Sequence, residues 1–277
     1  MDNFQINLGR QKRISIIGGI NVLDDIDEAI EIGMKFKKSC KKNKLSYVFK
    51  ASFDKANRSS HDSFRGPGFR KGLEILREIR NTLEVPILTD IHEIYQASEA
   101  AKVCDMLQLP AFLARQTDLI QALANTGKTI NIKKPQFISP DQIKFIIQKF
   151  SKFGCEDVVI CERGSMYGYN QQVVDFIGLE VIKEQTNKPI CVDITHSLQF
   201  RDEGKSSSNG RRRYALKLAK AVAATSIEAI FIEAYKKPEF AKCDGASAIP
   251  LNVISEFVDQ ICQIDNLVKN QPVCPIE

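Results

Sequence analysis

The sequence predicts an α/β protein, a single (β/α)8 TIM barrel in which residues 1–277 form one domain. Two observations favour this fold: eight short runs rich in β-branched residues occur along the chain, and segments of helical length separate them. Alternating units of this kind build parallel sheets, and eight of them in roughly 260 residues fit a closed barrel better than an open doubly wound sheet. No G-x-G-x-x-G motif follows the first run, which further disfavours a dinucleotide-binding sheet.

The predicted strands and helices alternate from the first run onward. We expect strands at residues 14–17, 47–49, 86–88, 106–109, 129–132, 158–161, 190–192 and 229–232. Apolar residues recur at three- and four-residue spacing in segments 72–83, 118–125, 141–150 and 213–225, which predicts helices there. Another amphipathic helix is expected to begin near Asp24, and the basic run 35–44 is interpreted as its exposed end, where cations suit the helix dipole.

Composition limits the kinds of molecule that the chain is expected to bind. The formal charge is +5 and the basic residues are scattered, so we expect no nucleic-acid binding and favour small anionic molecules as partners. No apolar run reaches the roughly 18 residues that span a bilayer, and no cleavage site follows the apolar run 14–20, so no membrane association is expected. Eight cysteines without a C-x-x-C pair or zinc-module spacing indicate reduced thiols and a cytoplasmic protein.

Polar side chains follow all eight runs, at the barrel end where (β/α)8 enzymes carry their chemistry. In chain order they are Asn21; Lys50, Ser52, Lys55, Asn57 and Arg58; Asp90 and His92; Gln108 and Arg115; Lys133, Lys134 and Gln136; Glu162 and Arg163; Asp193, His196 and Gln199; and Glu233 with Asp244. Four of these groups contain cations. The surplus of positive charge predicts a substrate with several negative charges, such as a phosphate and a carboxylate.

The segment from Lys50 to Gly68 is the most informative stretch of the chain. Its lysines, arginines, hydroxyls and glycines suit anion binding, because cations supply charge and glycines let the backbone approach a ligand. The alternative is a mobile solvated loop. We expect Phe53, Ala56 and Phe64 to anchor the segment.

Two cationic residues allow alternative interpretations. Lys133 is either a Schiff-base nucleophile or a fixed positive charge, and the second is favoured because Lys50, Lys55 and Arg163 would share its cavity. Lys134 lies on the opposite face of the strand and is expected to point out of the pocket. Arg163 follows the sixth run in a glycine-containing turn that suits bidentate phosphate binding. The structural alternative is a salt bridge of neighbouring Glu162 with another strand end.

His92 and His196 each follow an aspartate at a strand end, and with Glu233 and Asp244 they suggest a metal site. The first strand end offers only Asn21, a poor ligand, so catalytic, metal-binding and purely structural histidines all stay open. The polar stretch 200–213 is either a lid over a phosphate or a plain loop.

Five segments together resemble one family closely, across nearly the whole chain. They are FKASFDKANRSSHDSFRGPG, LQLPAFLARQTDL, INIKKPQFISP, DITHSLQ and AKCDGASAIPL. The family is 3-deoxy-D-manno-octulosonate 8-phosphate synthase, also called 2-dehydro-3-deoxyphosphooctonate aldolase. The resemblance implies a transferase that condenses phosphoenolpyruvate with D-arabinose 5-phosphate and water, giving 3-deoxy-D-manno-octulosonate 8-phosphate and phosphate for lipopolysaccharide (KDO) biosynthesis.

The resemblance also implies roles for residues at matching positions. The carboxylate of phosphoenolpyruvate is expected to contact Lys50, Ser52, Lys55 and Lys133, and its phosphate to contact the Ala111 backbone, Lys133 and Arg163. The sugar phosphate is expected to contact Asn57, Arg58 and Ser59. The reacting aldehyde and water are expected to be surrounded by His196, Glu233, Asp244 and Asp90. Arg115, in the FLAR motif, is expected to reach a neighbouring site in a homotetramer.

The family has metal-dependent and metal-independent branches, and the dependent one carries a cysteine after the first strand. Asn21 stands there, so we expect a metal-independent enzyme without a cofactor. The eighth loop departs from the family pattern at Tyr235, Lys236 and Lys237, which leaves its dynamics open but not the reaction. The nearest rival function is a sister synthase using erythrose 4-phosphate or an N-acetylmannosamine-type aldose, and a rival of another class is a barrel that binds phosphosugars without turnover.

Overall fold

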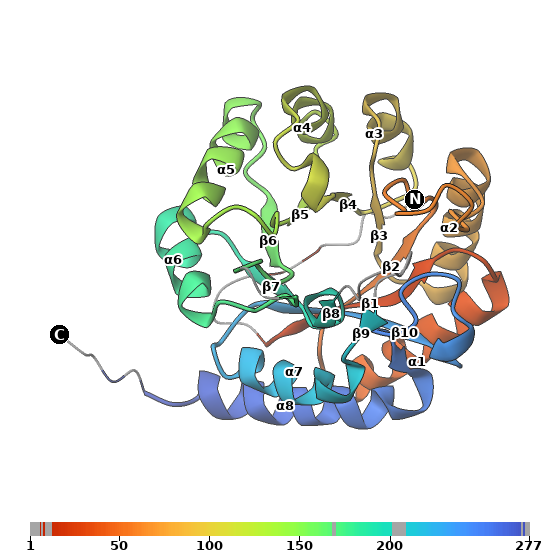
Figure 1. The fold of residues 1–277 in the computed structure, drawn as a ribbon. Coiled ribbons are helices and arrows are strands. Elements are labelled where there is room, and N and C mark those ends of the chain that lie inside the picture. Colours follow the sequence, from red (N-terminus) through yellow and green to blue (C-terminus); the bar gives the residue numbers. More distant parts are fainter. Residues whose placement is uncertain are drawn as a thin grey trace.

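The computed structural model describes residues 6, 8, 13–167, 170–200, 209–272 and 274. Eight parallel strands form a closed barrel in chain order: β1 (Ser15–Val22), β2 (Tyr47–Ser52), β3 (Ile87–Asp90), β4 (Met106–Leu109), β5 (Thr129–Lys133), β6 (Val158–Glu162), β7 (Ile190–Asp193) and β10 (Ala229–Tyr235). The barrel closes because β10 pairs with β1, with Gly19 opposite Glu233. Figure 1 shows the ring. The predicted (β/α)8 barrel is confirmed, and every predicted run lies in a barrel strand or extends one by a residue.

Helices cover the outside of the barrel (Figure 1). They are α1 (Ile26–Asn43), α2 (Phe69–Leu83), α3 (Ile94–Ala100), α4 (Thr117–Ala124), α5 (Ile143–Lys152), α6 (Phe176–Thr186), α7 (Ala215–Ala223) and α8 (Ile254–Lys269). Local signals define the α1 ends: the Asp25 side chain accepts a hydrogen bond from the Glu28 backbone N–H at 2.9 Å, and Lys44 ends the helix in a left-handed conformation. The four other predicted helices form with ends shifted by a few residues, since short 3-10 turns precede α5 and α7.

Two separate apolar clusters hold the barrel together. The larger cluster packs the strands against the helices. The smaller one fills the barrel interior and includes Leu8, Ile17, Val48, Met106 and Phe231, with Ile6 packed against it. Because the apolar layers fill the interior, the polar side chains of the strands gather at the carboxyl ends.

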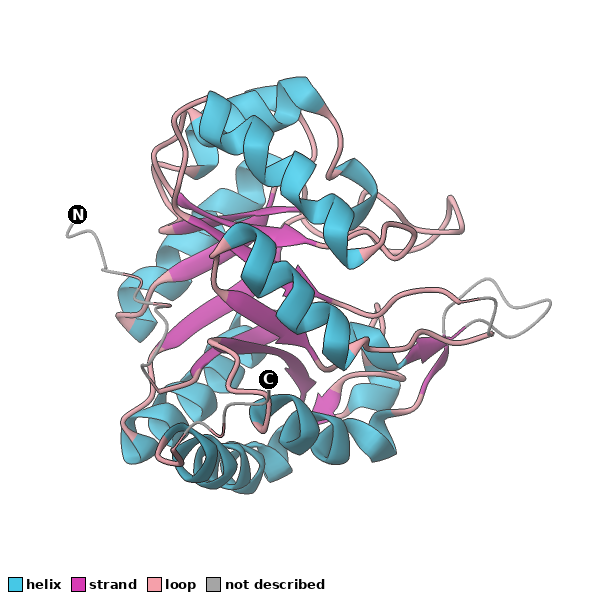
Figure 2. Cartoon of the chain, turned by 90° about the vertical axis from the view of Figure 1, so that its left-hand side faces the viewer, coloured by secondary structure: helices cyan, strands magenta, loops and turns pink. Residues whose placement is uncertain are grey.

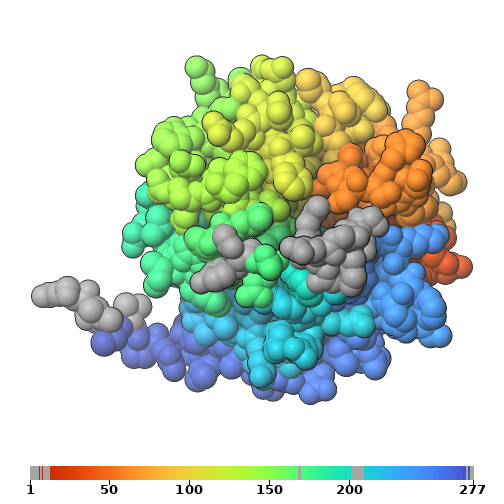
Figure 3. All heavy atoms as spheres, in the orientation of Figure 1, coloured from red at the N-terminus to blue at the C-terminus, as the bar shows by residue number. Residues whose placement is uncertain are grey.

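The carboxyl ends of the strands carry the long loops and a small hairpin, β8 (Gln199–Phe200) with β9 (Asn209–Gly210). A two-residue strand, β11 (Ile249–Pro250), pairs with the end of β10. Figure 2 shows the hairpin at the end toward which the barrel strands point, and Figure 3 shows the chain surrounding this face in sequence order. All eight cysteines are free thiols. Within the described ranges, no helix is long and apolar enough to cross a membrane.

The 50–68 segment is anchored differently from the prediction. Phe53 is fully buried against Phe69 and His92, with ring centroids 5.2 and 5.6 Å away. Ala56 is exposed and Phe64 is 36% exposed, so the expectation that they anchor the segment is wrong. Backbone hydrogen bonds replace them, because the Lys55 N–H donates to the Arg65 carbonyl at 2.7 Å and closes the loop on itself.

Candidate active site

A cavity of about 870 Å³ opens at the carboxyl ends of the strands. The loops after β2, β6, β7 and β10 form its walls, and seven predicted site residues line it: Lys55, Asn57, Arg58, Ser59, Arg163, His196 and Asp244. Six more lie buried in the strands themselves or directly after them: Asn21, Lys50, Ser52, Asp90, Lys133 and Glu233. The fold therefore gathers most of the predicted residues at one end of the barrel.

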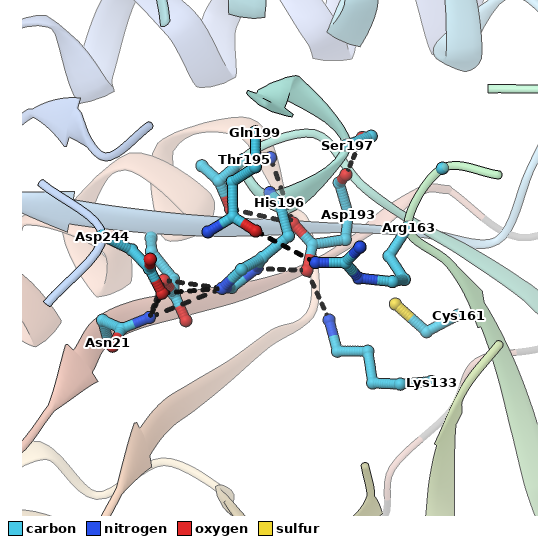
Figure 4. Close-up of polar contacts among 12 residues, drawn as sticks. Asn21, Lys133, Cys161, Arg163, Asp193, Thr195, His196, Ser197, Gln199 and Asp244 are labelled. Carbon is cyan, nitrogen blue, oxygen red and sulfur yellow. Dashed lines mark hydrogen bonds and ion pairs between the residues drawn. The ribbon is translucent and has the colours of Figure 1, made fainter. Parts of the chain in front are cut away.

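Asn21 is the centre of a cluster with Glu233, Asp244 and His196 (Figure 4). Its amide nitrogen donates to Glu233 Oε2 at 2.6 Å and to Asp244 Oδ2 at 3.3 Å. His196 Nε2 lies 3.4 Å from that nitrogen and 3.4 Å from the same Glu233 oxygen. The amide directs hydrogens, not lone pairs, at the point where the other three side chains converge.

This donor set does not fit a divalent ion, because a metal ligand must offer a lone pair. Among the described residues, no group of three or more histidine, cysteine or carboxylate side chains is arranged to hold a metal. His92 lies elsewhere: its Nε2 contacts Asp90 Oδ2 at 3.0 Å and its ring packs on Phe53. Of the alternatives left open for the two histidines, a metal site shared by His92 and His196 is therefore not supported.

Asp193 at the end of β7 fixes the orientation of His196. The carboxylate is fully buried and accepts from Lys133 Nζ at 2.5 Å, while its distance to His196 Nδ1 is 2.6 Å. It also accepts the backbone N–H groups of Thr195 and His196, at 3.0 and 2.8 Å. Burial opposes ionisation of Asp193, but the charges of His196 and Lys133 outweigh it and hold its pKa well below the ordinary value.

His196 is consequently held as an imidazolium ring. Burial alone would lower its pKa, but the charges of Asp193 and Glu233 outweigh burial and raise the pKa to about 9. Because Nδ1 is engaged by Asp193, the proton on Nε2 points toward Glu233 and Asp244. At neutral pH this ring can donate a proton to a group bound beside it.

The buried lysines differ in protonation. Burial lowers the pKa of Lys50 to about 8, although Asp90 lies 3.5 Å from its ammonium group and opposes the change. For Lys133, the Asp193 charge outweighs burial and raises the pKa, and its ammonium group lies 3.4 Å from the centroid of the Phe231 ring. Lys133 is thus a fixed positive charge, which argues against the Schiff-base alternative.

Lys55 and Asp90 are the remaining charged groups of the site whose pKa values are shifted. The carboxylates of Asp90 and Glu233 outweigh burial and raise the pKa of Lys55. Burial opposes ionisation of Asp90, yet Lys50 and Lys55 hold its pKa well below the usual range. Both groups are therefore ionised at neutral pH.

Lys134 and Glu162 form an ion pair away from the cavity. Lys134 is fully buried, with Nζ 3.3 Å from Glu162 Oε2 and 2.8 Å from Ser165 Oγ. The salt bridge considered for Glu162 therefore exists, but it joins Lys134 and leaves Arg163 to the cavity. Arg163 instead donates to the side-chain oxygens of Gln172 and Gln199.

Two predicted residues do not join the cavity within this chain. Arg115 is exposed, and its backbone carbonyl accepts a hydrogen bond from Lys149 at 3.0 Å. Ala111 begins a 3-10 turn, η1 (Ala111–Leu113), and of this turn it is Phe112 that lines the cavity.

Residues 201–208 of the suggested lid lie outside the described residues; Arg212, just after them, donates to the Gly245 carbonyl at 3.2 Å. In the eighth loop, Tyr235 is buried and Lys236 pairs with Glu31.

The roles implied by the resemblance did not include Asp193, Gln172, Gln199, Cys243 and Phe231, although Asp193 and Gln199 are among the polar residues that follow the strands. Asp193 and Gln199 carried a signal, because they follow the seventh run. Cys243 lies within the AKCDG motif and contacts Arg58, and its Sγ lies 3.4 Å from Asp244 Oδ2. Gln172 and Phe231 carried none, since a loop glutamine and a strand phenylalanine are common structural residues.

The fold and this geometry define a class of protein: a (β/α)8 barrel enzyme with buried cations and titratable groups gathered at the carboxyl ends of its strands. Comparison with known proteins is more specific. Residues 1–270 match the model of the DAHP synthetase I family, and the chain belongs to that family.

Among its relatives, a protein of Parasynechococcus marenigrum (strain WH8102) is 48% identical over 272 residues, covering 98% of this chain and 96% of that protein. One of Aliivibrio fischeri (strain MJ11) is 50% identical over 265 residues, with 95% and 93% covered. One of Chromobacterium violaceum is 47% identical over 266 residues, with 96% and 94% covered. All three are named 2-dehydro-3-deoxyphosphooctonate aldolase.

Proposed function

We propose that this protein is a transferase that condenses phosphoenolpyruvate with D-arabinose 5-phosphate and water, giving 3-deoxy-D-manno-octulosonate 8-phosphate and phosphate for lipopolysaccharide biosynthesis. The names of the relatives support this aldol-type reaction. The observation that carries it is the buried charge at the carboxyl ends of the strands. The cations of Lys50, Lys133 and Arg163 are buried there. Beside them His196, Glu233 and Asp244 meet at Asn21, and Lys50 Nζ lies 3.9 Å from Glu233 Oε1.

The cations bind the anionic groups of the two substrates. Lys50, Ser52, Lys55 and Lys133 bind the carboxylate of phosphoenolpyruvate, and Lys133, Arg163 and the Ala111 backbone bind its phosphate. Asn57, Arg58 and Ser59 bind the sugar phosphate at the cavity wall. The burial of Lys50 and Lys133 supports these roles, because a charge removed from water attracts an anion more strongly.

The remaining groups manage protons. Carbon 3 of phosphoenolpyruvate attacks the aldehyde carbon, and the new alkoxide takes a proton from His196 Nε2. Positive charge develops at carbon 2, where water attacks and gives its proton to Glu233 or Asp244. Collapse of this adduct expels phosphate and leaves the keto acid. Asp90 favours the charged forms of Lys50 and Lys55 beside the reacting centre.

No metal or other cofactor enters these steps. The Asn21 amide donates to the two carboxylates that a bound ion would need, which supports membership of the metal-independent branch. Asn21→Cys is expected to gain a response to added divalent metal, since a thiolate replaces the donor with a lone pair. Loss of native activity on chelation would contradict the assignment.

Arg115 supports a homotetrameric assembly. It is exposed and lies outside its own cavity, so we propose that it reaches the site of a neighbouring subunit. Mixing Arg115→Ala with His196→Ala subunits tests this proposal. Mixed assemblies should regain activity if each variant supplies what the other lacks, and no recovery would contradict a shared site.

A cytoplasmic location stays a prediction of the sequence.

One assay tests substrate, reaction and metal together. Purified protein is incubated with phosphoenolpyruvate and arabinose 5-phosphate, erythrose 4-phosphate or N-acetylmannosamine, each with and without chelator, and phosphate release is measured. We expect release with arabinose 5-phosphate in both conditions. Preference for another aldose would favour a sister synthase, and tight phosphoenolpyruvate binding with no release for any aldose would indicate a binding protein.

A further inference from the structure

Arg163 is held by two neutral amide oxygens. Its Nη1 donates to Gln172 Oε1 at 2.5 Å and its Nη2 donates to Gln199 Oε1 at 3.1 Å; Figure 4 draws the second bond. The arginine is 8% exposed and lines the cavity. A guanidinium has five N–H groups, so these two bonds leave others for a ligand.

Nearby carboxylates are committed to other cations. Glu162 accepts the Gly164 N–H at 2.5 Å and pairs with Lys134 at 3.3 Å, while Asp193 pairs with Lys133 and His196. Across the described part of the chain, no carboxylate lies within ion-pair distance of Arg163. Its positive charge is therefore fixed in direction without being neutralised.

Gln172 is itself held firmly. Ser165 and Val173 exchange two backbone hydrogen bonds of 2.8 and 3.0 Å beside it, and its carbonyl accepts from Arg211 at 3.2 Å. Gly164 adopts φ +93°, and a Cβ there would lie 2.7 Å from Gln172 Cβ, so only glycine allows this close approach. The side-chain amide thus approaches Arg163 from a segment that backbone hydrogen bonds hold in place.

We propose that Gln172 is a positioning residue for phosphate recognition: its neutral oxygen orients the Arg163 guanidinium toward the substrate phosphate and preserves the full positive charge. The proposal rests on the function proposed above for Arg163. A glutamate would keep the shape and the acceptor but add a neutralising charge, and a methionine would keep the approximate shape without a strong acceptor. Orientation and charge can therefore be separated.

The experiment measures inorganic phosphate and phosphoenolpyruvate binding calorimetrically for wild type, Gln172→Met and Gln172→Glu, together with the KM of each substrate and kcat. We expect about a threefold to tenfold weaker affinity for both anions in Gln172→Met and about a hundredfold weaker affinity in Gln172→Glu, because a new carboxylate competes with the ligand for Arg163. The KM for arabinose 5-phosphate should stay the same. Gln171→Met is the control, since Gln171 accepts from Arg211 and not from Arg163.

Equal losses in the two variants would overturn the proposal, since a packing role predicts no effect of charge. Unchanged phosphate affinity in Gln172→Met would also overturn it, because orientation would then be unnecessary. Failure of the wild-type protein to bind either anion would instead refute the function proposed for Arg163. The two failures are distinguishable because they appear in different proteins.

Discussion

Replacing Asp193 by asparagine is expected to change the protonation of His196. The substitution keeps the shape of the side chain but removes the charge 2.6 Å from Nδ1. The rise of the His196 pKa from 6.5 to about 9 corresponds to ~3 kcal/mol in favour of the protonated ring. Asp193 is the largest favourable contribution, so without it we expect the pKa to fall to about 6.5 or lower.

The consequence for activity follows from the fraction of protonated rings. At pH 7.5 a ring with a pKa of 9 is about 97% protonated, whereas one with a pKa of 6.5 is about 10% protonated. Because only the protonated ring can act as the general acid, kcat should fall about tenfold at pH 7.5 and recover at lower pH.

Histidine NMR measures this directly, since the chain has only His61, His92 and His196. The other two rings serve as internal references, and His196→Gln assigns the signal. Ser197→Ala is the matched control, because its hydroxyl donates to the backbone carbonyl of Asp193 and leaves the carboxylate intact. A wild-type His196 that titrates near 6.5, or an unchanged titration in Asp193→Asn, would refute the reasoning.

Three further predictions test other parts of the site. Arg58→Ala should raise the KM of the aldose phosphate by about tenfold or more, since a charged hydrogen bond is lost, and should have little effect on the KM of phosphoenolpyruvate. Equal losses for both substrates would contradict the assignment of Arg58 to the sugar phosphate. Arg65→Ala is the control, because it removes only a pairing with Asp54 at 2.8 Å. Phosphoenolpyruvate affinity, measured by calorimetry, should fall as pH rises through about 8, because Lys50 is charged below that value and neutral above it; Lys50→Met should abolish this dependence, and its persistence would exclude Lys50. Gly19→Ala should lower the free energy of unfolding in urea by about 3 kcal/mol or more, because a Cβ would lie 2.0 Å from the Lys50 carbonyl oxygen; a smaller loss would mean that β1 and β2 separate easily.

The sequence predicted the barrel because each strand is a short apolar run buried on both faces, a pattern that survives without any knowledge of contacts. Topology then placed residues such as Lys50 and His196 at one end. The partners of those residues depend on distances between loops, which spacing does not encode. Asp193 joins His196 to Lys133 across 60 residues of chain, and Gln172 reaches Arg163 from a loop with no distinctive motif.

The incorrect predictions about the 50–68 segment and His92 have the same cause, because residue spacing does not give the direction of a side chain. Ala56 and Phe64 are apolar, so the sequence assigned them to the interior, but the segment lies over the open end of the barrel and closes through its backbone. His92 follows a strand as His196 does, yet its ring packs on Phe53 and contacts Asp90. Side-chain direction, more than position along the chain, decided these cases.

The pairing of β1 with β10 affects how the protein acquires activity during synthesis. Asn21 and Glu233 lie 212 residues apart in sequence, and their 2.6 Å hydrogen bond crosses the join that closes the barrel. A nascent chain holds β1 without its partner until most of the protein has left the ribosome, so this long-range contact forms late in folding. Closure of the barrel is therefore a precondition for the Asn21 cluster, and a refolding chain should bind substrate only after β10 has docked on β1.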